Sequence, residues 1–378
     1  MSITTRTGLL AGLAVGAIAL TGCGSSGKSA SAGDSSNSGS NSASASSTGN
    51  VECASGSIKA EGSTAQSNAM EQWIKDYQAA CSGTTITYNG TGSGAGVSNF
   101  IAKQDDFAGS DSALDPAKDE VAKASAACGS SALNLPMVTG PIAVAYKLNG
   151  VKDLTLTPQL ITKIFLGKIT SWDDPAIKAL NSAASLPSTK ITVFYRGDSS
   201  GTTQNFEKYL AANDPTDFTS KPDKDSSKAG FAGQGKTGSQ GVQQAIGSTE
   251  GAIGYVEWSF AVSGNLNTAK VDNGAGPVEL TADTAGAAVS AAKVASNGGQ
   301  DLTLKLDYAT KTAGAYPIIL VTYEIVCSKH SDAKIGSLVK SFLTYTAGEG
   351  QATLKDLGYA PLPSTIQAKV QAAVATLS

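Results

Sequence analysis

The sequence has little of what a nucleic-acid-binding or metal-binding protein needs. Its 378 residues include one histidine, His330, and arginine occurs only at positions 6 and 196. The formal net charge is −3 at pH 7, and the lysines form no basic run. Nucleic-acid binding requires a basic surface, and a zinc site requires clustered histidines or closely spaced cysteines. We therefore expect no nucleic-acid partner, no metal site and no cofactor.

Long apolar runs are missing after the first twenty residues. Residues 8–20 form an uncharged apolar run that is too short to span a bilayer and is typical of a secretory signal. The Leu20-Thr21-Gly22-Cys23 sequence that follows resembles a bacterial lipobox, in which the cysteine becomes the lipid-modified N-terminus. An ordinary signal peptide with an incidental cysteine is the alternative. We expect a lipoprotein signal peptide at residues 1–22 and lipidation of Cys23.

Large apolar side chains are also scarce between Gly24 and Asn50, where Ser, Gly, Ala and Asn dominate. Such a composition cannot form a core and predicts a flexible tether at residues 23–50. The folded part should then begin near Val51 and be held by lipid on the extracytoplasmic face of the cell membrane. About 328 residues remain, a length that accommodates two lobes.

Cysteine is used sparingly but in an even number after the lipobox, at positions 53, 81, 128 and 327. In an exported protein this predicts two disulfides, and the sequence alone allows three pairings. Cys53 precedes a first strand, and Cys81 ends the helix that should run back beside that strand. We therefore favour the pairs Cys53–Cys81 and Cys128–Cys327.

Strand patterns alternate with helix patterns along the rest of the chain, which predicts α/β layers with mainly parallel sheets. Three turns rich in Ser, Thr and Gly lead from a strand into a helix, at residues 62–65, 90–96 and 197–202. Ligands of such sheets bind beyond the carboxyl ends of strands, where free N–H groups of helices attract anions. The second turn superficially resembles a dinucleotide fingerprint, but residues 107–110 do not form a convincing strand, which argues against a nucleotide site.

The stretch Tyr195 to Thr202 is the strongest single candidate for an anion site. Arg196 is the only guanidinium outside the leader, and arginine binds oxyanions bidentately where lysine offers a point charge. Ser199, Ser200 and Thr202 add hydroxyls, and Gly201 permits close approach of the backbone. The alternative is a polar turn between a strand at 191–195 and a helix at 203–212.

Asp111 follows Gly109-Ser110 in a loop and has two interpretations. A carboxylate suits an anion site only if the anion carries a proton to donate. Alternatively, Asp111 or Ser112 caps a helix at residues 113–127, which local sequence favours when it is considered alone.

Six motifs occur in an order that resembles the periplasmic phosphate-binding proteins of the Pst ABC transporter. They are Gly62-Ser63-Thr64, Gly92-Ser93-Gly94, Gly109-Ser110-Asp111, Arg196 to Thr202, the run Phe165 to Pro175, and Gly251 to Glu257. The resemblance covers nearly all of the chain after Val51. It implies an α/β, two-lobed type II periplasmic-binding-protein fold, with mixed sheets flanked by helices and the ligand in the interlobe cleft. It implies lobe I from residues 51–143 and 318–378, and lobe II from 144–317.

The resemblance also implies roles for individual residues. The phosphate-binding set would be Thr64, Ala65, Ser93, Asp111, Arg196, Ser200, Gly201 and Thr202, supported by Ser63 and Asp198. Asp111 would accept a hydrogen bond from the proton of phosphate, and Asp198 would brace Arg196. Ala65 stands where the family often has a bulky aromatic residue, so the wall beside the ligand differs while the backbone donor remains.

The expected function is therefore capture of inorganic phosphate by a monomer that delivers it to ABC transporter permease subunits. Phosphate always keeps a proton near neutral pH and sulfate does not, so Asp111 would select phosphate. Rival hypotheses are a secreted phosphatase, a binder of sulfate or molybdate, and an adhesive surface protein. No histidine accompanies a candidate nucleophile, so we expect no enzyme.

Overall fold

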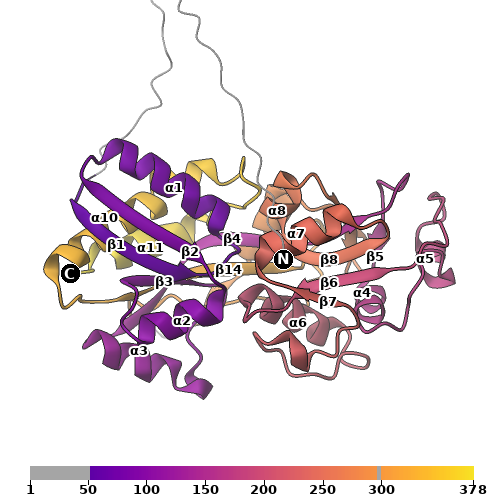
Figure 1. Cartoon of the computed structure of the whole chain (residues 1–378), viewed down its shortest axis with the longest axis horizontal. Coiled ribbons are helices and arrows are strands. Elements are labelled where there is room, and N and C mark those ends of the chain that lie inside the picture. Colours follow the sequence, from indigo (N-terminus) through magenta and orange to yellow (C-terminus); the bar gives the residue numbers. More distant parts are fainter. Residues whose placement is uncertain (1–51, 296–298) are drawn as a thin grey trace, which may run out of the picture. The chain divides into compact units, whose positions relative to one another are not determined.

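The computed structural model describes residues 52–295 and 299–378, and this part forms one compact unit with elements shown in Figure 1. The expected signal peptide, Cys23 and the whole of the expected tether lie outside the described residues. Among the described residues, none of the helices has both the length and the apolar content needed to cross a membrane.

Helices and strands alternate along the chain. The helices are α1 (Ser67–Ala80), α2 (Ser93–Ile101), α3 (Glu120–Cys128), α4 (Pro158–Phe165), α5 (Pro175–Leu180), α6 (Gly201–Asn213), α7 (Gly238–Ser248), α8 (Trp258–Ser263), α9 (Ala282–Ser290), α10 (Ala333–Ala347) and α11 (Ser364–Ala375), with short 3-10 turns η1 (Pro116–Lys118), η2 (Ser226–Lys228) and η3 (Glu349–Thr353). The strands are β1 (Gly56–Gly62), β2 (Thr84–Gly90), β3 (Phe107–Ser110), β4 (Ala132–Lys147), β5 (Thr155–Leu156), β6 (Thr192–Arg196), β7 (Gln234–Lys236), β8 (Ala252–Glu257), β9 (Asn267–Thr268), β10 (Lys270–Asp272), β11 (Pro277–Val278), β12 (Lys293–Val294), β13 (Leu304–Lys305) and β14 (Ile319–Cys327).

One mixed sheet organises the fold, in the order β2-β1-β3-β14-β4-β8-β6-β7, with β9 paired to β4. Parallel pairs lie towards its two ends, where β1 pairs with β2 and β3, and β6 pairs with β7 and β8. Antiparallel pairs occupy the centre, where β14 joins β3 to β4 and β4 pairs with β8. The mixed α/β sheet is confirmed, whereas the expectation of mainly parallel pairing is wrong at the centre of the sheet.

Strand β4 connects the two halves of this sheet. Residues 132–141 pair with β14, and residues 142–147 pair with β8. Fifteen of its sixteen residues are buried, as the near-continuous apolar sequence predicts for a central strand. A separate apolar core packs around each end of the sheet, one including Trp73, Phe107 and Phe342, the other Trp172, Phe206 and Tyr255.

Two local expectations are corrected. Residues 107–110 do form a strand, β3, because pairing with both β1 and β14 buries a segment whose own sequence is short and contains Gly109. The expected helix at 113–127 is shorter: α3 begins at Glu120, after a 3-10 turn that the side chain of Asp115 caps.

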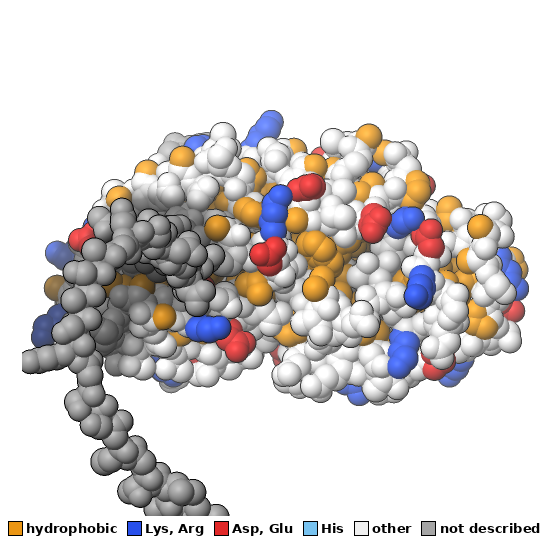
Figure 2. All heavy atoms as spheres, turned by 90° about the horizontal axis from the view of Figure 1, so that it is seen from above, with side chains coloured by type: hydrophobic (Ala, Val, Ile, Leu, Met, Phe, Trp, Pro, Cys, Tyr) orange, Lys and Arg blue, Asp and Glu red, His pale blue; other side chains and the backbone are white. Residues whose placement is uncertain are grey.

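Both disulfides have the favoured pairing. Cys53 bonds Cys81, and Cys128 bonds Cys327. The first ties the chain before β1 to the end of α1, and the second ties α3 to β14. On the face shown in Figure 2, lysines and acidic side chains are interspersed, in keeping with the small net charge and with the absence of a basic run in the sequence.

Candidate functional site

Three segments from the first half of the chain meet at the carboxyl ends of β1, β2 and β3. Ser63, Thr64 and Ala65 follow β1, Ser93 opens α2, and Asp111 follows β3 directly. All five residues are buried. The Ala65 N–H donates to Ser63 Oγ over 3.0 Å. Parallel strands bring their carboxyl ends to one edge, which explains why residues far apart in sequence converge here.

Asp111 lies at the centre of this group, 3% exposed. Its carboxylate accepts hydrogen bonds from Ser63, from Thr322 at 2.8 Å and from Ser93 at 3.0 Å. Burial raises the pKa of Asp111 above its ordinary value, while the bonds from Ser63, Thr322 and Ser93 act in the opposite direction. The helix-capping interpretation of Asp111 is wrong, because these three donors are hydroxyls and α3 begins only at Glu120.

Arg196 ends β6 and is 2% exposed. Its Nε donates to Asp198 Oδ1 over 2.7 Å, and its Nη2 contacts the other carboxylate oxygen. Burial lowers the pKa of Arg196, but the hydrogen bond and charge of Asp198 outweigh it and hold the pKa above its ordinary value. The remaining nitrogen, Nη1, reaches Thr64 Oγ1 at 2.7 Å and Ser239 Oγ at 3.1 Å.

The start of α6 faces Asp111 and Ser93. Ser200 caps the helix by accepting from the Thr203 N–H, and the Gly201 N–H donates to Ser93 Oγ over 3.2 Å. A Cβ atom on Gly201 would lie 2.6 Å from both Asp111 Cβ and Ser93 Oγ, so glycine permits this approach. The free N–H groups of a helix start add positive potential at the same place.

The structure thus brings together all eight residues proposed from the sequence as ligands, with Ser63 and Asp198 beside them. Hydroxyls, backbone N–H groups and one guanidinium from both halves of the sheet lie together with the buried carboxylate of Asp111. Such a set can bind a protonated oxyanion. The histidine is elsewhere: Nε2 of His330 lies 3.1 Å from the carbonyl of Asp106.

Comparison with known proteins identifies the family. Residues 40–349 match the model of the PBP superfamily domain. The chain is 43% identical over 366 residues to the phosphate-binding protein PstS 3 of Mycobacterium leprae, covering 96% of this chain and 95% of the relative. It is 32% identical over 306 residues to the phosphate-binding protein PstS of Xylella fastidiosa, covering 80% of each.

This chain belongs to the PstS family of the PBP superfamily. A solved structure of a high-affinity periplasmic phosphate-binding protein (PfluDING) bound with phosphate has the same fold, with a TM-score of 0.67 at 24% identity over 84% of this chain and 93% of that one. The type II periplasmic-binding fold expected from the sequence is confirmed. The relatives are named as binding proteins, which agrees with the expectation that the chain is not an enzyme.

Four further residues of this PstS family member touch the site and were not predicted. Thr322 donates to Asp111, Ser239 lies against Thr64 and Arg196, Glu257 accepts from Thr202, and Asn205 donates to the Asp111 carbonyl. Glu257 ends the Gly251 to Glu257 motif of the family, so the sequence offered a signal that could have identified it as a site residue. Ser239 follows Gly238 at the start of α7, so only the Gly-Ser pair at a helix start could have indicated it.

Proposed function

We propose that this protein is a monomeric solute-binding protein that captures inorganic phosphate outside the cytoplasm and delivers it to the permease subunits of an ABC transporter. The names of its relatives support the ligand. Within the site, Asp111 is the main support for the proposal, because a buried carboxylate next to a helix N-terminus, in a site that also contains Arg196, suits an anion that brings its own proton.

In this proposal lobe I, residues 51–143 and 318–378, and lobe II, residues 144–317, close on the ligand. Lobe I supplies hydroxyls and backbone donors, and lobe II supplies the guanidinium and the start of α6. The phosphate ligands are Thr64, Ala65, Ser93, Asp111, Arg196, Ser200, Gly201 and Thr202. A ligand that touches both lobes favours their closed arrangement.

Selection of phosphate over sulfate follows from hydrogen-bond chemistry. A phosphate hydroxyl can donate to Asp111, whereas sulfate places an unprotonated oxygen against the carboxylate. A buried site that leaves a polar group unpaired rejects the wrong ligand by about 10⁴-fold or more. The same carboxylate disfavours molybdate, which is unprotonated at neutral pH.

The test is a calorimetric titration of phosphate and sulfate into protein that has been unfolded and refolded to remove bound anion. Asp111→Asn should weaken phosphate and strengthen sulfate, narrowing their affinity ratio by at least about 100-fold, since the amide can donate where the carboxylate could only accept. Asp119→Asn is the matched control: Asp119 is exposed and has φ 57°, a conformation that asparagine tolerates. An unchanged ratio in Asp111→Asn would refute the role of Asp111.

We further propose that Cys23 is lipidated after removal of residues 1–22, and that residues 23–50 tether the folded part to the extracytoplasmic face of the cell membrane. The lipobox-like sequence and the composition of the tether support this. Cys23→Ser should move the protein from the membrane fraction to the medium, and continued sedimentation with membranes would contradict the anchor.

A further inference from the structure

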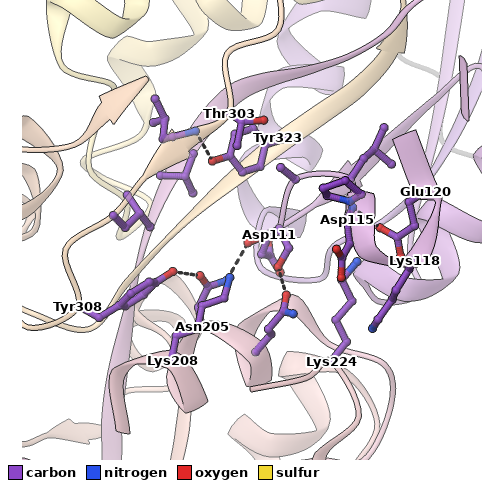
Figure 3. Close-up of a pocket in the computed structure, with 18 residues that line it drawn as sticks. Asp111, Asp115, Lys118, Glu120, Asn205, Lys208, Lys224, Thr303, Tyr308 and Tyr323 are labelled. Carbon is purple, nitrogen blue, oxygen red and sulfur yellow. Dashed lines mark hydrogen bonds between the residues drawn. The ribbon is translucent and has the colours of Figure 1, made fainter. Parts of the chain in front are cut away.

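A cavity lined by Asp111 lies next to the proposed phosphate site (Figure 3). Its volume is about 360 Å³, within the range of small-molecule sites. Acidic residues Asp115 and Glu120 come from the segment after β3, whereas Lys208 lies on α6 and Lys224 follows that helix. Both halves of the proposed cleft therefore line it.

Lys224 is the unusual feature of this cavity. It is 6% exposed, and its Nζ has no hydrogen-bond partner within residues 52–295 and 299–378. Figure 3 shows its side chain directed into the cavity towards Asp115. Lysine is almost never buried without a partner, because loss of hydration of an ammonium group is costly.

Lys208 is the second cation of the cavity, with its Nζ 6.0 Å from the centre of the Tyr308 ring. Burial lowers the pKa of Lys208, and the charge of Lys224 lowers it further. The two ammonium groups are therefore near enough to repel each other. A shared anion would relieve that repulsion.

The acidic side chains around the cavity offset the burial of these two lysines only in part. The charge of Asp115 raises the pKa of both lysines, and the charges of Glu120 and Asp111 raise that of Lys224, but these carboxylates accept hydrogen bonds from other groups. Asp115 Oδ1 accepts from the Ala117 N–H, and Glu120 Oε2 accepts from the Asp115 N–H, each over 2.8 Å. The Asp111 carboxylate accepts from its three hydroxyl donors. Among the described residues, neither Lys208 nor Lys224 has a carboxylate within ion-pair distance.

Lys118, the third cation of the cavity, is already paired. Its Nζ lies 3.5 Å from Asp223 Oδ2. Two ammonium groups thus remain available to a ligand.

The rest of the wall is largely apolar. Leu114, Leu304, Leu306 and Val321 line it with the ring of Tyr308. An inorganic anion would satisfy the lysines but leave this wall in contact with water. An anionic head group attached to an apolar body matches both parts.

We propose that this cavity is a second binding site, for a small amphipathic organic anion whose carboxylate, sulfonate or phosphate group lies between Lys208 and Lys224. The site adjoins the phosphate site and shares Asp111 with it, but its cations, Lys208 and Lys224, are not among the proposed phosphate ligands. Since both halves line the cavity, its occupant favours the closed arrangement and strengthens phosphate binding, and phosphate strengthens binding of the occupant to the same degree.

The probe for this site is p-toluenesulfonate, which has a sulfonate head and an apolar ring and carries no proton for Asp111. It is titrated by calorimetry into the full chain saturated with phosphate, with inorganic sulfate as a second arm. We expect saturable binding of p-toluenesulfonate, weakened at least about 10-fold by Lys208→Gln and by Lys224→Gln, because each removes a charge-assisted contact. Lys221→Gln, an exposed position in the same segment as Lys224, should bind as the wild type does.

Several results would overturn the proposal: no binding by the wild type, unchanged binding by both lysine variants, or full displacement of the probe by an equal concentration of sulfate. The last would show that the apolar wall contributes nothing. Phosphate titrations on the same variants separate this site from the phosphate site, since Lys208→Gln and Lys224→Gln should keep phosphate binding. Lys208 is only half-buried, so Lys208→Gln should fold even if Lys224→Gln does not. Its effect on p-toluenesulfonate binding then tests the proposal.

Discussion

Glu324 is a buried acid on the same strand as Thr322 and is not one of the proposed ligands. It is on β14 opposite Gly109 of β3 and has no exposed surface. Burial raises the pKa of Glu324 to about 8, while the amide of Gln66 acts in the opposite direction and the charge of Asp111 raises it further. The folded protein therefore holds this proton more tightly than the unfolded chain, in which the pKa is near 4.5.

This difference predicts a pH dependence of stability. The stabilisation that comes from protonated Glu324 is fully present below about pH 4.5. As the pH rises from there towards 8, the free energy of unfolding should fall by up to about 1.4 kcal/mol per pH unit. Glu324→Gln keeps the shape of the side chain without its charge. This variant should therefore lack the part of the decline in stability that is due to Glu324. Urea unfolding at several pH values measures it, with Glu279→Gln at an exposed position as control. Equal pH slopes for wild type and Glu324→Gln would contradict the prediction.

The remaining pH dependence of that variant has an identifiable source. Burial also raises the pKa of Glu207 to about 8, and this side chain on α6 accepts from the Asp223 N–H. We expect a residual decline in stability over the same range, since Glu207 is unchanged in the variant.

At single residues, the sequence was informative where a rare residue type stood in a motif. Arg196 could be proposed because no other arginine follows the leader. Thr322 could not, since its hydroxyl reaches Asp111 across 211 residues and stands in an ordinary apolar strand. Lys224 was likewise hidden, because its burial arises from tertiary packing around a polar segment.

Helix α6 is the element that positions the second half of the phosphate site. Its first residue, Gly201, lies so close to Asp111 and Ser93 that any side chain would collide. Gly201→Ala should therefore hold the two halves apart and weaken phosphate binding by at least about 10-fold, because a displaced donor set loses several hydrogen bonds at once. Titration calorimetry measures the loss.

The fold itself should tolerate that change, since alanine is the best helix former and the conflict lies between elements. Gly286→Ala on α9, where a Cβ would meet nothing within 4 Å, is the control and should leave phosphate binding unchanged. Wild-type affinity in Gly201→Ala would show that α6 approaches Asp111 less closely than the structure places it.

Helices and strands could be predicted where a long run of sequence showed the pattern. The prediction failed where pairing with other strands determined the structure. The buried strands β4, β8 and β14 follow from their apolar sequences. Strand β3 has only four residues and owes its existence to β1 and β14 on either side of it. The antiparallel centre of the sheet was missed because alternating helices and strands favour parallel pairing, while the direction in which β14 returns to the sheet depends on contacts distant in sequence.

For the whole molecule, the important feature is one continuous sheet with two large, separate apolar cores. Strand β4 contributes to both, changing partner from β14 to β8 near Pro141 and Ile142. The contacts between the two halves at the site are polar, including Arg196 with Thr64 and Gly201 with Ser93. Small polar interfaces of this kind permit relative motion, and a ligand that bonds to both sides shifts the population towards closure.

We therefore expect phosphate to compact the folded part, residues 51–378. In phosphate-stripped protein, water can hydrate the carboxylate of Asp111 and the guanidinium of Arg196 once the halves separate. This hydration favours the open arrangement. Saturating phosphate replaces that water with bonds from both sides, and the radius of gyration from small-angle X-ray scattering should fall. Sulfate should not produce this change, and Gly201→Ala should reduce it, because its two halves cannot meet. Identical scattering with and without phosphate would mean that the halves are held together by their own contacts, and that Arg196, Gly201 and Asp111 form a rigid site.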